Sequence, residues 1–597
     1  MAWWGRSGNK RRWSIAALAS GALAIAAALT IAATPDGPEL AGAPPGDAAS
    51  DCETEPQRRS GPLAFATAEG FGKYARGGRG GAVFIVDTLA DSGPGSLRAC
   101  AEATGRRTCV FSVSGTIAVD SWISVQSPYL TIAGQTSPGG IAIKVNNSQN
   151  TPLLVQTHDV IIRHLRLRPG PAKSDSENID TIQVSGGAHD VILDHLSTSW
   201  PTDEGINIVG DGKRRRACMD TRDITVQWSI MSEGLDHANR GAHSRGTYFG
   251  YGARNISFHH NLIASNVRRN PLLNTREQFD MINNVVFNSG RYNGEFYTRF
   301  GALGVNAVGN VGIIGPSSDK TSRLYLIDYF RDYPADFAIY LRDNIDIHRP
   351  ANRGDERLVL EPGDWRYVRQ VPVGPLSLPT ASITAPAQAY RDVMAFAGAT
   401  RPRRDSADVR LLADMAACRG QIIDDPVQVG GWPKLAGPPA AADADQDGMA
   451  DAWAISRGLS PADPPDRNAP GTGGYTNLEN YLGALAGDDA GGRAGTAPGP
   501  APEPSCGFAV ADAGPMPEIR ISATPTSIAP GESAMVRWEG TDIEACKAFG
   551  VLLMGQGTRI VRPAATTTYA ISCTGTRGGD AIDAVIVEVR PRQPATR

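Results

Sequence analysis

The stretch HDVIIRHLRL, residues 158–167, returns along the chain as HDVILDHLST (189–198), RDITVQWSIM (222–231) and RNISFHHNLI (254–263). Looser copies follow as QFDMINNVVF (278–287), VNAVGNVGII (305–314) and FAIYLRDNID (337–346). Each copy alternates apolar and other residues, passes a polar residue, and ends in a second short apolar run. A repeat of this length, built from short strands, is typical of a solenoid.

The copies align on one position after the first apolar run. Successive aligned residues lie 31, 33, 32, 23, 26 and 34 residues apart, and they are Leu165, Leu196, Ser229, Asn261, Asn284, Asn310 and Asn344. Stacked coils would place these asparagines above one another, where their side chains can form a hydrogen-bonded ladder. A sandwich would instead need regularly spaced hairpin turns, which the sequence lacks. The pattern therefore favours a parallel β-helix with loops of variable length.

Length and composition limit the remaining possibilities. A chain of 597 residues is too long for one compact core, so an elongated solenoid with further domains is expected. Its 41% hydrophobic and 20% charged residues are typical of a globular, mostly β protein. The formal net charge of -4 gives no general reason to bind nucleic acid or an anionic membrane. We expect a monomer.

The N-terminus resembles an export signal. A basic head at 6–12 is followed by an apolar run at 13–33 and by the small residues Ala-Gly-Ala at 41–43. We interpret 1–43 as a signal peptide and 44–60 as a linker, which makes the protein secreted or displayed at the cell surface. The alternative is a retained anchor, because the apolar run is long enough to cross a bilayer.

Eight cysteines fit an oxidising compartment. Cys100 and Cys109 are close enough to close a short loop, and Cys546 and Cys573 lie in two strand-like runs near the C-terminus, so two disulfides are predicted. The sequence does not assign the remaining four, which are Cys52, Cys218, Cys418 and Cys506.

Several stretches carry a family resemblance. They are the glycine-rich opening from AFATAEGFGKYARGGRGG to GPGSLRAC (64–100), VSGTI (113–117), LTIAGQTSPG (130–139), VILDHLSTSW (191–200), FHHNLIASN (258–266) and RNP (269–271). Together they resemble bacterial pectate lyases of polysaccharide lyase family 1, over about residues 61–435. The resemblance implies a right-handed parallel β-helix of the pectin-lyase type. It also implies calcium-dependent cleavage of an acidic polysaccharide, pectate (homogalacturonan), by β-elimination.

Elimination needs an active-site cation. The C5 proton of galacturonate is weakly acidic, and its removal becomes feasible when Ca²⁺ neutralises the neighbouring C6 carboxylate. The resemblance places calcium ligands at Asp180 and Glu204. Asp203 could add a third carboxylate, although in a strand it would face away from Glu204. The family's other ligand in this region aligns with Ile208, which cannot bind a cation.

The family uses an arginine as the base, within an R-x-P-x-x-R pattern. Arg269 matches the first arginine, but position 274 is asparagine, so Arg268 or Arg276 would have to bind the substrate carboxylate. Arg240 matches the position of a substrate-binding lysine, or else is a solvated loop residue. An arginine base requires a high working pH or a strongly polarised site, because guanidinium normally keeps its proton.

A second calcium site is predicted in 436–485. The motif DADQDGMAD has the spacing of an EF-hand loop, with Gly448 at the sharp turn and carboxylates at Asp443, Asp445, Asp447 and Asp451. The twelfth position is Ala454, so Glu479 or Asn477 would have to complete a structural site. The alternative is an acidic turn without metal.

The C-terminal part reads as a separate module. After an Ala/Gly/Pro-rich linker at 486–516, residues 517–591 alternate as strands and resemble an immunoglobulin-like β-sandwich, with Trp538 in its core. The whole chain is thus expected to be all-β, a secreted pectate lyase with Ca²⁺ as cofactor. Two alternatives stay open: a glycoside hydrolase, and a non-catalytic β-helix protein that binds acidic polysaccharide or serves at the cell surface.

Overall fold

The computed structural model describes residues 61–146, 151–171, 178–212, 220–238, 241–291, 293–327, 337–374, 380–488, 506, 517–549, 551–575 and 580–590. The predicted signal peptide, the linker at 44–60 and nearly all of the linker at 486–516 lie outside them. Within the described ranges, no helix combines the length and apolar character needed to span a bilayer.

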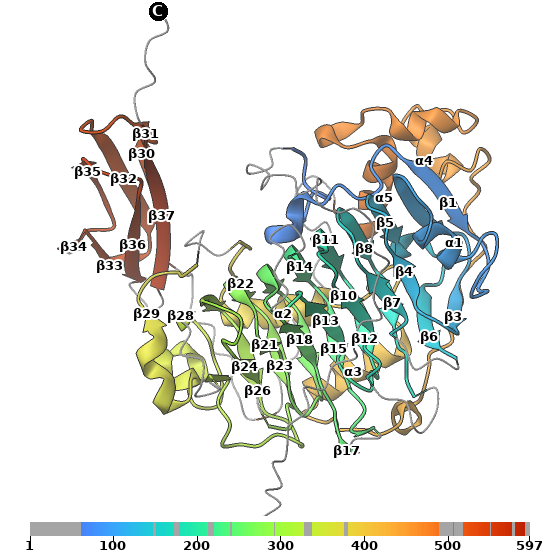
Figure 1. Ribbon diagram of the computed structural model, residues 1–597, viewed down its shortest axis with the longest axis horizontal. Helices are drawn as coiled ribbons and strands as arrows, with labels where there is room; N and C mark the ends of the chain where they lie inside the picture. The colour runs from blue at the N-terminus through green and yellow to red at the C-terminus, as the bar shows by residue number, and fades with distance from the viewer. Residues whose placement is uncertain are drawn as a thin grey trace, which may run out of the picture. The chain divides into compact units, whose positions relative to one another are not determined.

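Three parallel sheets form the main domain, and the chain passes through them in a fixed order, coil after coil (Figure 1). The strands of sheet A are β1 (Ala82–Val86), β2 (Arg107–Phe111), β5 (Leu130–Ala133), β8 (Val160–Arg163), β11 (His189–Asp194), β14 (Arg222–Gln227), β19 (Arg254–His259), β22 (Arg276–Ile282), β25 (Leu303–Val308), β28 (Phe337–Arg342) and β29 (Val368–Arg369).

The other two sheets have eight strands each. Sheet B contains β3 (Gly115–Val119), β6 (Ile141–Val145), β9 (Arg166–Leu167), β12 (Ser197–Ser199), β15 (Ile230–Ser232), β20 (Leu262–Ala264), β23 (Val285–Phe287) and β26 (Val311–Ile313). Sheet C contains β4 (Ile123–Val125), β7 (Leu153–Val155), β10 (Ile182–Val184), β13 (Ile206–Val209), β18 (Thr247–Gly250), β21 (Leu272–Leu273), β24 (Gly294–Phe296) and β27 (Tyr325–Ile327).

The register of sheet A shows why the repeat was visible in the sequence. Val160, Val191, Ile224 and Ile256 align across four neighbouring strands, and all four side chains are buried in the common core. Each copy of the pattern thus supplies one coil, as the solenoid prediction required. The predicted parallel β-helix is confirmed.

The corner between sheets A and B repeats as well. Its first residue has a left-handed backbone in successive coils, with φ of 53° at His164, 53° at His195, 52° at Trp228 and 55° at His260. The rings of His164 and His195 stack at 4.7 Å, and those of Trp228 and His260 at 4.3 Å. These histidines therefore serve the packing of the corner.

The second residue of this corner forms the predicted asparagine ladder. Side-chain amides donate from Asn261 to Asn284 at 3.0 Å, from Asn284 to Asn310 at 3.0 Å and from Asn310 to Asn344 at 2.9 Å. All four side chains are buried, so the ladder satisfies polar groups that water cannot reach.

The glycine-rich opening lies across the outside of sheet A. A short 3-10 helix, Phe71–Tyr74, runs there, and the backbone N–H of Gly72 donates to Thr225 Oγ1 at 2.9 Å. A Cβ at Gly72 would collide with the backbone oxygen of Val191, and one at Gly78 with that of Arg107. These glycines allow the segment to approach the sheet closely.

Two helices cover sheet B. α2 (Pro386–Phe396) and α3 (Ser406–Ala416) pack against Ile230, Leu262 and Val285 of that sheet. Both helices therefore lie along the solenoid. Asp405 caps the N-terminus of α3 and also forms a buried ion pair with Arg168.

The Asp-rich segment packs on the first coils. It holds α4 (Asp451–Ser456) and α5 (Asn477–Ala486), and its Met449, Leu478 and Leu482 form a cluster with Val110 and Ala133 of sheet A. Beyond α5, an oxygen of Asp488 lies 2.6 Å from the guanidinium of Arg163, and both side chains are buried. The segment is therefore packed on the β-helix.

Three disulfides are present in the described part of the chain. Cys100–Cys109 ties the short helix α1 (Leu97–Ala101) to β2, and Cys546–Cys573 joins two strands of the C-terminal module, both as predicted. Cys418 is bonded to Cys506, a pair that the sequence left unassigned. Cys52 and Cys218 lie outside the described residues.

The C-terminal module consists of two packed sheets around Trp538, which is buried as predicted. One sheet contains β30 (Glu518–Thr524), β32 (Ala534–Thr541) and β35 (Gln556–Val561). The other contains β31 (Ser527–Ile528), β37 (Asp580–Val589), β36 (Thr567–Gly575), β33 (Ile543–Ala548) and β34 (Val551–Leu553). Its immunoglobulin-like character stays a prediction.

Candidate active site

Charged side chains gather where successive coils enter sheet C. Asp180, Glu204 and Arg245 each stand two residues before a strand of this sheet, β10, β13 and β18 respectively. Arg269 stands three residues before the next strand, β21. Since these strands are neighbours, the four side chains belong to one edge of the sheet.

Three carboxylates meet at this edge. Asp180, Asp203 and Glu204 each place an oxygen within 4.8 Å of the others. Asp180 is 4% exposed and Glu204 is 2% exposed, so both are shielded from water. Asp203 and Glu204 lie in a bend ahead of β13, where the alternation of a strand does not apply. The expectation that Asp203 faces away from Glu204 was therefore wrong.

Asp180 is bound to the next coil by two hydrogen bonds. It accepts hydrogen bonds from the backbone N–H of Glu204 at 3.0 Å and from Asn207 Nδ2 at 2.7 Å. Burial, together with the charge of Asp203, raises the pKa of Asp180 well above its usual range. Asn207 thus occupies the outward position of β13, whereas Ile208 points into the core.

Asp203 is held by basic groups. Nε2 of His243 lies 2.8 Å from its Oδ1, and Nε of Arg245 lies 3.6 Å from the same oxygen. Burial raises the pKa of Asp203, but the hydrogen bond with His243 and the charge of Arg269 outweigh it, so the pKa is lowered overall. Asp203 therefore remains ionised at neutral pH.

Arg269 faces the carboxylates. Its guanidinium forms an ion pair with Glu204, lies 3.9 Å from Asp203 Oδ1, and sits over the ring of Tyr248 at 5.3 Å from the centroid. Its side chain is 25% exposed, which leaves one side open to solvent. The site thus combines a cluster of acids with one fixed, accessible arginine.

Two of the other predicted arginines, Arg268 and Arg276, pair with carboxylates outside the cluster. Arg268 forms an ion pair of 2.5 Å with the buried carboxylate of Glu295. Arg276 begins β22 in sheet A, past the next corner, where it pairs with Asp220 and Glu277. The structure therefore does not bring Arg276 to the carboxylates. Arg240 lies outside the described residues.

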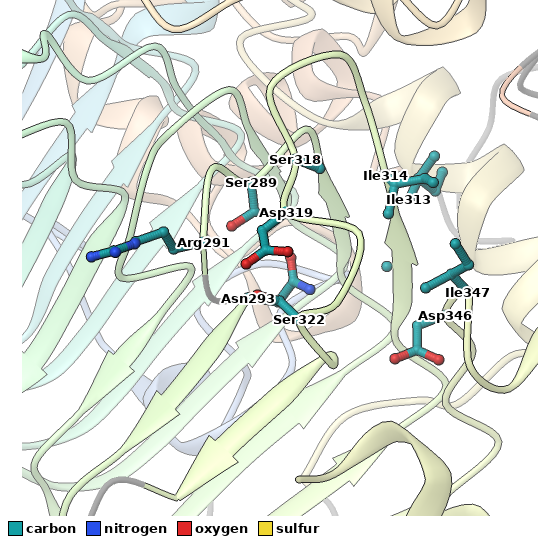
Figure 2. A pocket seen from close by; sticks show the side chains of 11 residues that line it. Ser289, Arg291, Asn293, Ile313, Ile314, Ser318, Asp319, Ser322, Asp346 and Ile347 are labelled. Carbon is teal, nitrogen blue, oxygen red and sulfur yellow. The ribbon is translucent and has the colours of Figure 1, made fainter.

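A polar pocket lies one coil further along (Figure 2). Its lining includes Ser289, Arg291, Asn293 and Asp319. The backbone oxygen of Asn293 accepts a hydrogen bond from the N–H of Asn270 at 3.0 Å, so the pocket adjoins the loop that carries Arg269.

The Asp-rich loop forms a second acidic cluster from Asp443, Asp445 and Asp447. Burial, with the charges of its acidic neighbours, raises the pKa of Asp447 to about 7. One of those neighbours is Asp466, which the sequence did not single out. Among the described residues, Asp445 Oδ2 and Asp466 Oδ1 are buried without a hydrogen-bond partner.

Three further residues were predicted as ligands of this loop, Asp451 and either Glu479 or Asn477, and all three have other contacts. Asp451 begins α4, and its Oδ1 accepts from the N–H of Ala444 at 2.9 Å. Glu479 forms an ion pair of 2.6 Å with Arg79 and a capping box with Thr476 at the start of α5. The prediction that Glu479 closes the metal shell therefore does not match its contacts.

Sequence reasoning missed Asn207, His243, Arg245, Tyr248 and Glu295. A signal was available for two of them. Arg245 repeats the position of Asp180 and Glu204 before a sheet-C strand, and Asn207 follows Glu204 at an outward strand position. His243 and Glu295 carry no comparable signal.

The chain is similar to curated fungal proteins. It is 34% identical over 431 residues to a probable pectate lyase C of Aspergillus fumigatus, covering 71% of this chain and 94% of that protein. A probable pectate lyase C of Aspergillus flavus is 33% identical over 440 residues, with the same coverage of 71% and 94%. No family model matches the chain.

Solved structures are more distant. The cedar-pollen allergen Jun a 1 has 16% identity and a TM-score of 0.39, with 55% of this chain and 91% of that chain covered. A pectate lyase bound to a hexasaccharide has 14% identity and a TM-score of 0.37, with 56% and 98% covered.

Proposed function

Because this chain belongs to the pectate lyase family, we propose that it cleaves pectate by calcium-assisted β-elimination, with Arg269 as the base. The observation that carries the proposal is the meeting of Asp180, Asp203 and Glu204 in front of the Arg269 guanidinium. A carboxylate cluster and an accessible base on one sheet edge are the two parts that this reaction needs.

The carboxylates fit a calcium ion. Ca²⁺ prefers oxygen ligands and tolerates irregular geometry, and three acidic side chains supply such oxygens within 4.8 Å of one another. Glu204 is buried and pairs with Arg269 through Oε1, so a bound Ca²⁺ would share this carboxylate with the arginine. A bound Ca²⁺ would neutralise the C6 carboxylate of a galacturonate and acidify its C5 proton.

In the proposed reaction, Arg269 removes the C5 proton. The electrons of the C–H bond form a C4–C5 double bond, the C4–O bond to the next sugar breaks, and the departing oxygen takes up a proton. The products are a shortened chain and an oligogalacturonide with a 4,5-unsaturated end. Since guanidinium normally holds its proton, the rate should rise with pH in the alkaline range.

We also propose a structural Ca²⁺ at Asp443, Asp445 and Asp447. The buried, unpartnered oxygens of Asp445 and Asp466 support it, and we propose Asp466, whose charge acts on Asp447, as a ligand in place of Glu479. The N-terminal sequence supports a secreted or cell-surface location, and the module at 517–590 would then act as a spacer or anchor outside the cell.

The test is the ultraviolet absorbance of unsaturated uronate, followed with polygalacturonate at alkaline pH, with and without Ca²⁺. Wild type should give a calcium-dependent rise that Arg269→Ala abolishes. Arg106→Ala removes an exposed arginine that precedes β2 and serves as the matched control, with a wild-type rate. Binding of the polymer without any rise would support the non-catalytic alternative. New reducing ends without absorbance would indicate hydrolysis.

A further inference from the structure

Glu295 lies beneath the loop that carries Arg269. It is the middle residue of β24 and pairs with Leu272 of β21, the strand that follows this loop. Its backbone N–H donates to the oxygen of Pro271 at 2.9 Å. The carboxylate is completely buried. Its partners come from the preceding coil, which carries Arg268 and Arg269.

Both carboxylate oxygens of Glu295 accept hydrogen bonds, from this loop and from Tyr297. Oε1 accepts from the backbone N–H of Arg269 at 3.0 Å, and Oε2 lies 2.5 Å from Nη2 of Arg268. The hydroxyl of Tyr297 donates to Oε2 at 3.4 Å. A buried carboxylate is stable only with such donors, so the contacts fix the loop to the sheet.

The backbone of Arg269 needs this support. Its φ of 59° is left-handed, a conformation that is unfavourable for a residue other than glycine. The peptide groups on both sides are bonded: the N–H to Glu295, and the carbonyl oxygen to the N–H of Thr247 at 2.6 Å. This conformation directs the side chain across Tyr248 toward Glu204.

We propose that Glu295 is a positioning residue for the elimination, one that acts through the backbone of Arg269. The inference rests on the proposed function, because it assumes that Arg269 is the base. Glu295 holds the left-handed turn that places the guanidinium before the carboxylate cluster. It also neutralises Arg268, so that two adjacent arginines do not repel each other at the site.

The two substitutions at Glu295 separate its functions. Glu295→Ala removes the acceptor of the Arg269 N–H as well as the charge, whereas Glu295→Gln keeps an oxygen that can accept the same hydrogen bond. A displaced base slows the chemical step but leaves substrate affinity largely intact. A displacement of about 1 Å can cost about 100-fold in rate.

The experiment measures kcat and KM on polygalacturonate with saturating Ca²⁺ for full-length wild type and variants. Glu295→Ala should lower kcat between about 10- and 100-fold with little change in KM, and Glu295→Gln should recover part of the loss. The matched control is Glu233→Gln, which alters a buried glutamate that follows β15 and pairs with Arg410 of α3. It should lose stability but keep its kcat.

The outcomes distinguish the two proposals. If both variants fold and have the same kcat as wild type, Glu295 has no positioning role. If Glu295→Ala does not fold, Glu295→Asp replaces it, because the shorter side chain keeps the charge but withdraws the acceptor from the Arg269 N–H. An unchanged kcat in Glu295→Asp then counts against the role. If wild type forms no unsaturated product, the proposed function itself fails, and Glu295 cannot position a base.

Discussion

The side-chain amide of Asn284 donates to the side-chain oxygen of Asn310 at 3.0 Å, one coil further along the helix. The backbone N–H of Asn284 donates to the same oxygen at 2.9 Å. On its other side, Asn284 accepts from the side chain of Asn261 at 3.0 Å. One residue thus joins three coils.

Replacing Asn284 by Ala should destabilise the helix. The change leaves buried donors and acceptors of Asn261 and Asn310 unpaired, which costs roughly 1–3 kcal/mol of unfolding free energy. Urea denaturation measures the loss. Asn146→Ala, which removes an exposed hydrogen bond to Asp120, should change stability by less than about 0.5 kcal/mol. Equal midpoints for the two variants would contradict the ladder's role.

The proposed catalytic calcium site makes a prediction for Glu204. Glu204→Gln keeps the shape of the side chain but removes one charge from the cluster. Calcium affinity depends on ligand charge, so the Ca²⁺ concentration for half-maximal activity should rise about tenfold or more. Glu102→Gln, an exposed change near α1, should keep the wild-type calcium dependence. An unaltered dependence in Glu204→Gln would place the cation elsewhere.

The lowered pKa of Asp159 should make the stability of the protein depend on pH in the acid range. Burial raises the pKa of Asp159, but hydrogen bonds with His158 and Arg76 outweigh it and hold the pKa far below its ordinary value of about 4. The unfolded chain therefore takes up the proton first. The stabilisation is complete above about pH 4 and is lost as the pH falls toward the folded-state pKa.

Asp159→Asn tests this expectation. The variant should be less stable than wild type at neutral pH, and its stability should fall less steeply below about pH 4. Thermal unfolding followed at several pH values gives both quantities. Parallel curves for the two proteins would show that Asp159 does not contribute to the acid response.

Removing the proposed structural cation should affect the first coils as well as the loop. The Asp-rich segment packs Met449, Leu478 and Leu482 against sheet A, so loosening the loop weakens that contact. A chelator should lower the melting temperature of wild type, and Ca²⁺ should restore it. Asp445→Asn should melt early under both conditions, while Asp414→Asn, a carboxylate of α3, should respond like wild type. A chelator without effect on wild type would rule out the site.

The sequence contains enough to predict the solenoid because each coil repeats the same burial pattern and corner. The family resemblance also indicated Asp180, Glu204 and Arg269, which the structure brings to one edge of sheet C. The direction of Asp203 could not be read, because a bend replaces the strand that the local sequence suggested. Arg276 was misplaced because loops of variable length hide where one sheet ends and the next begins.

Other misses have different causes. Glu479 was assigned to calcium although TNLE at 476–479 has the spacing of a capping box, so a local signal was available. The pairing of Cys418 with Cys506 spans 88 residues, and no spacing rule predicts it. Glu295 becomes visible only in three dimensions, because its partners Arg268 and Arg269 come from the neighbouring coil.

The ion pair between Arg163 and Asp488 joins residues that are 325 positions apart in the chain. During synthesis, Arg163 leaves the ribosome long before Asp488 has been made. Until then the guanidinium, which is buried in the finished protein, lacks one of its two acidic partners and must stay hydrated or pair with Asp194 alone. The first coils can therefore reach their final packing only near the end of translation, and a chain cut short before residue 488 would carry an incomplete N-terminal end.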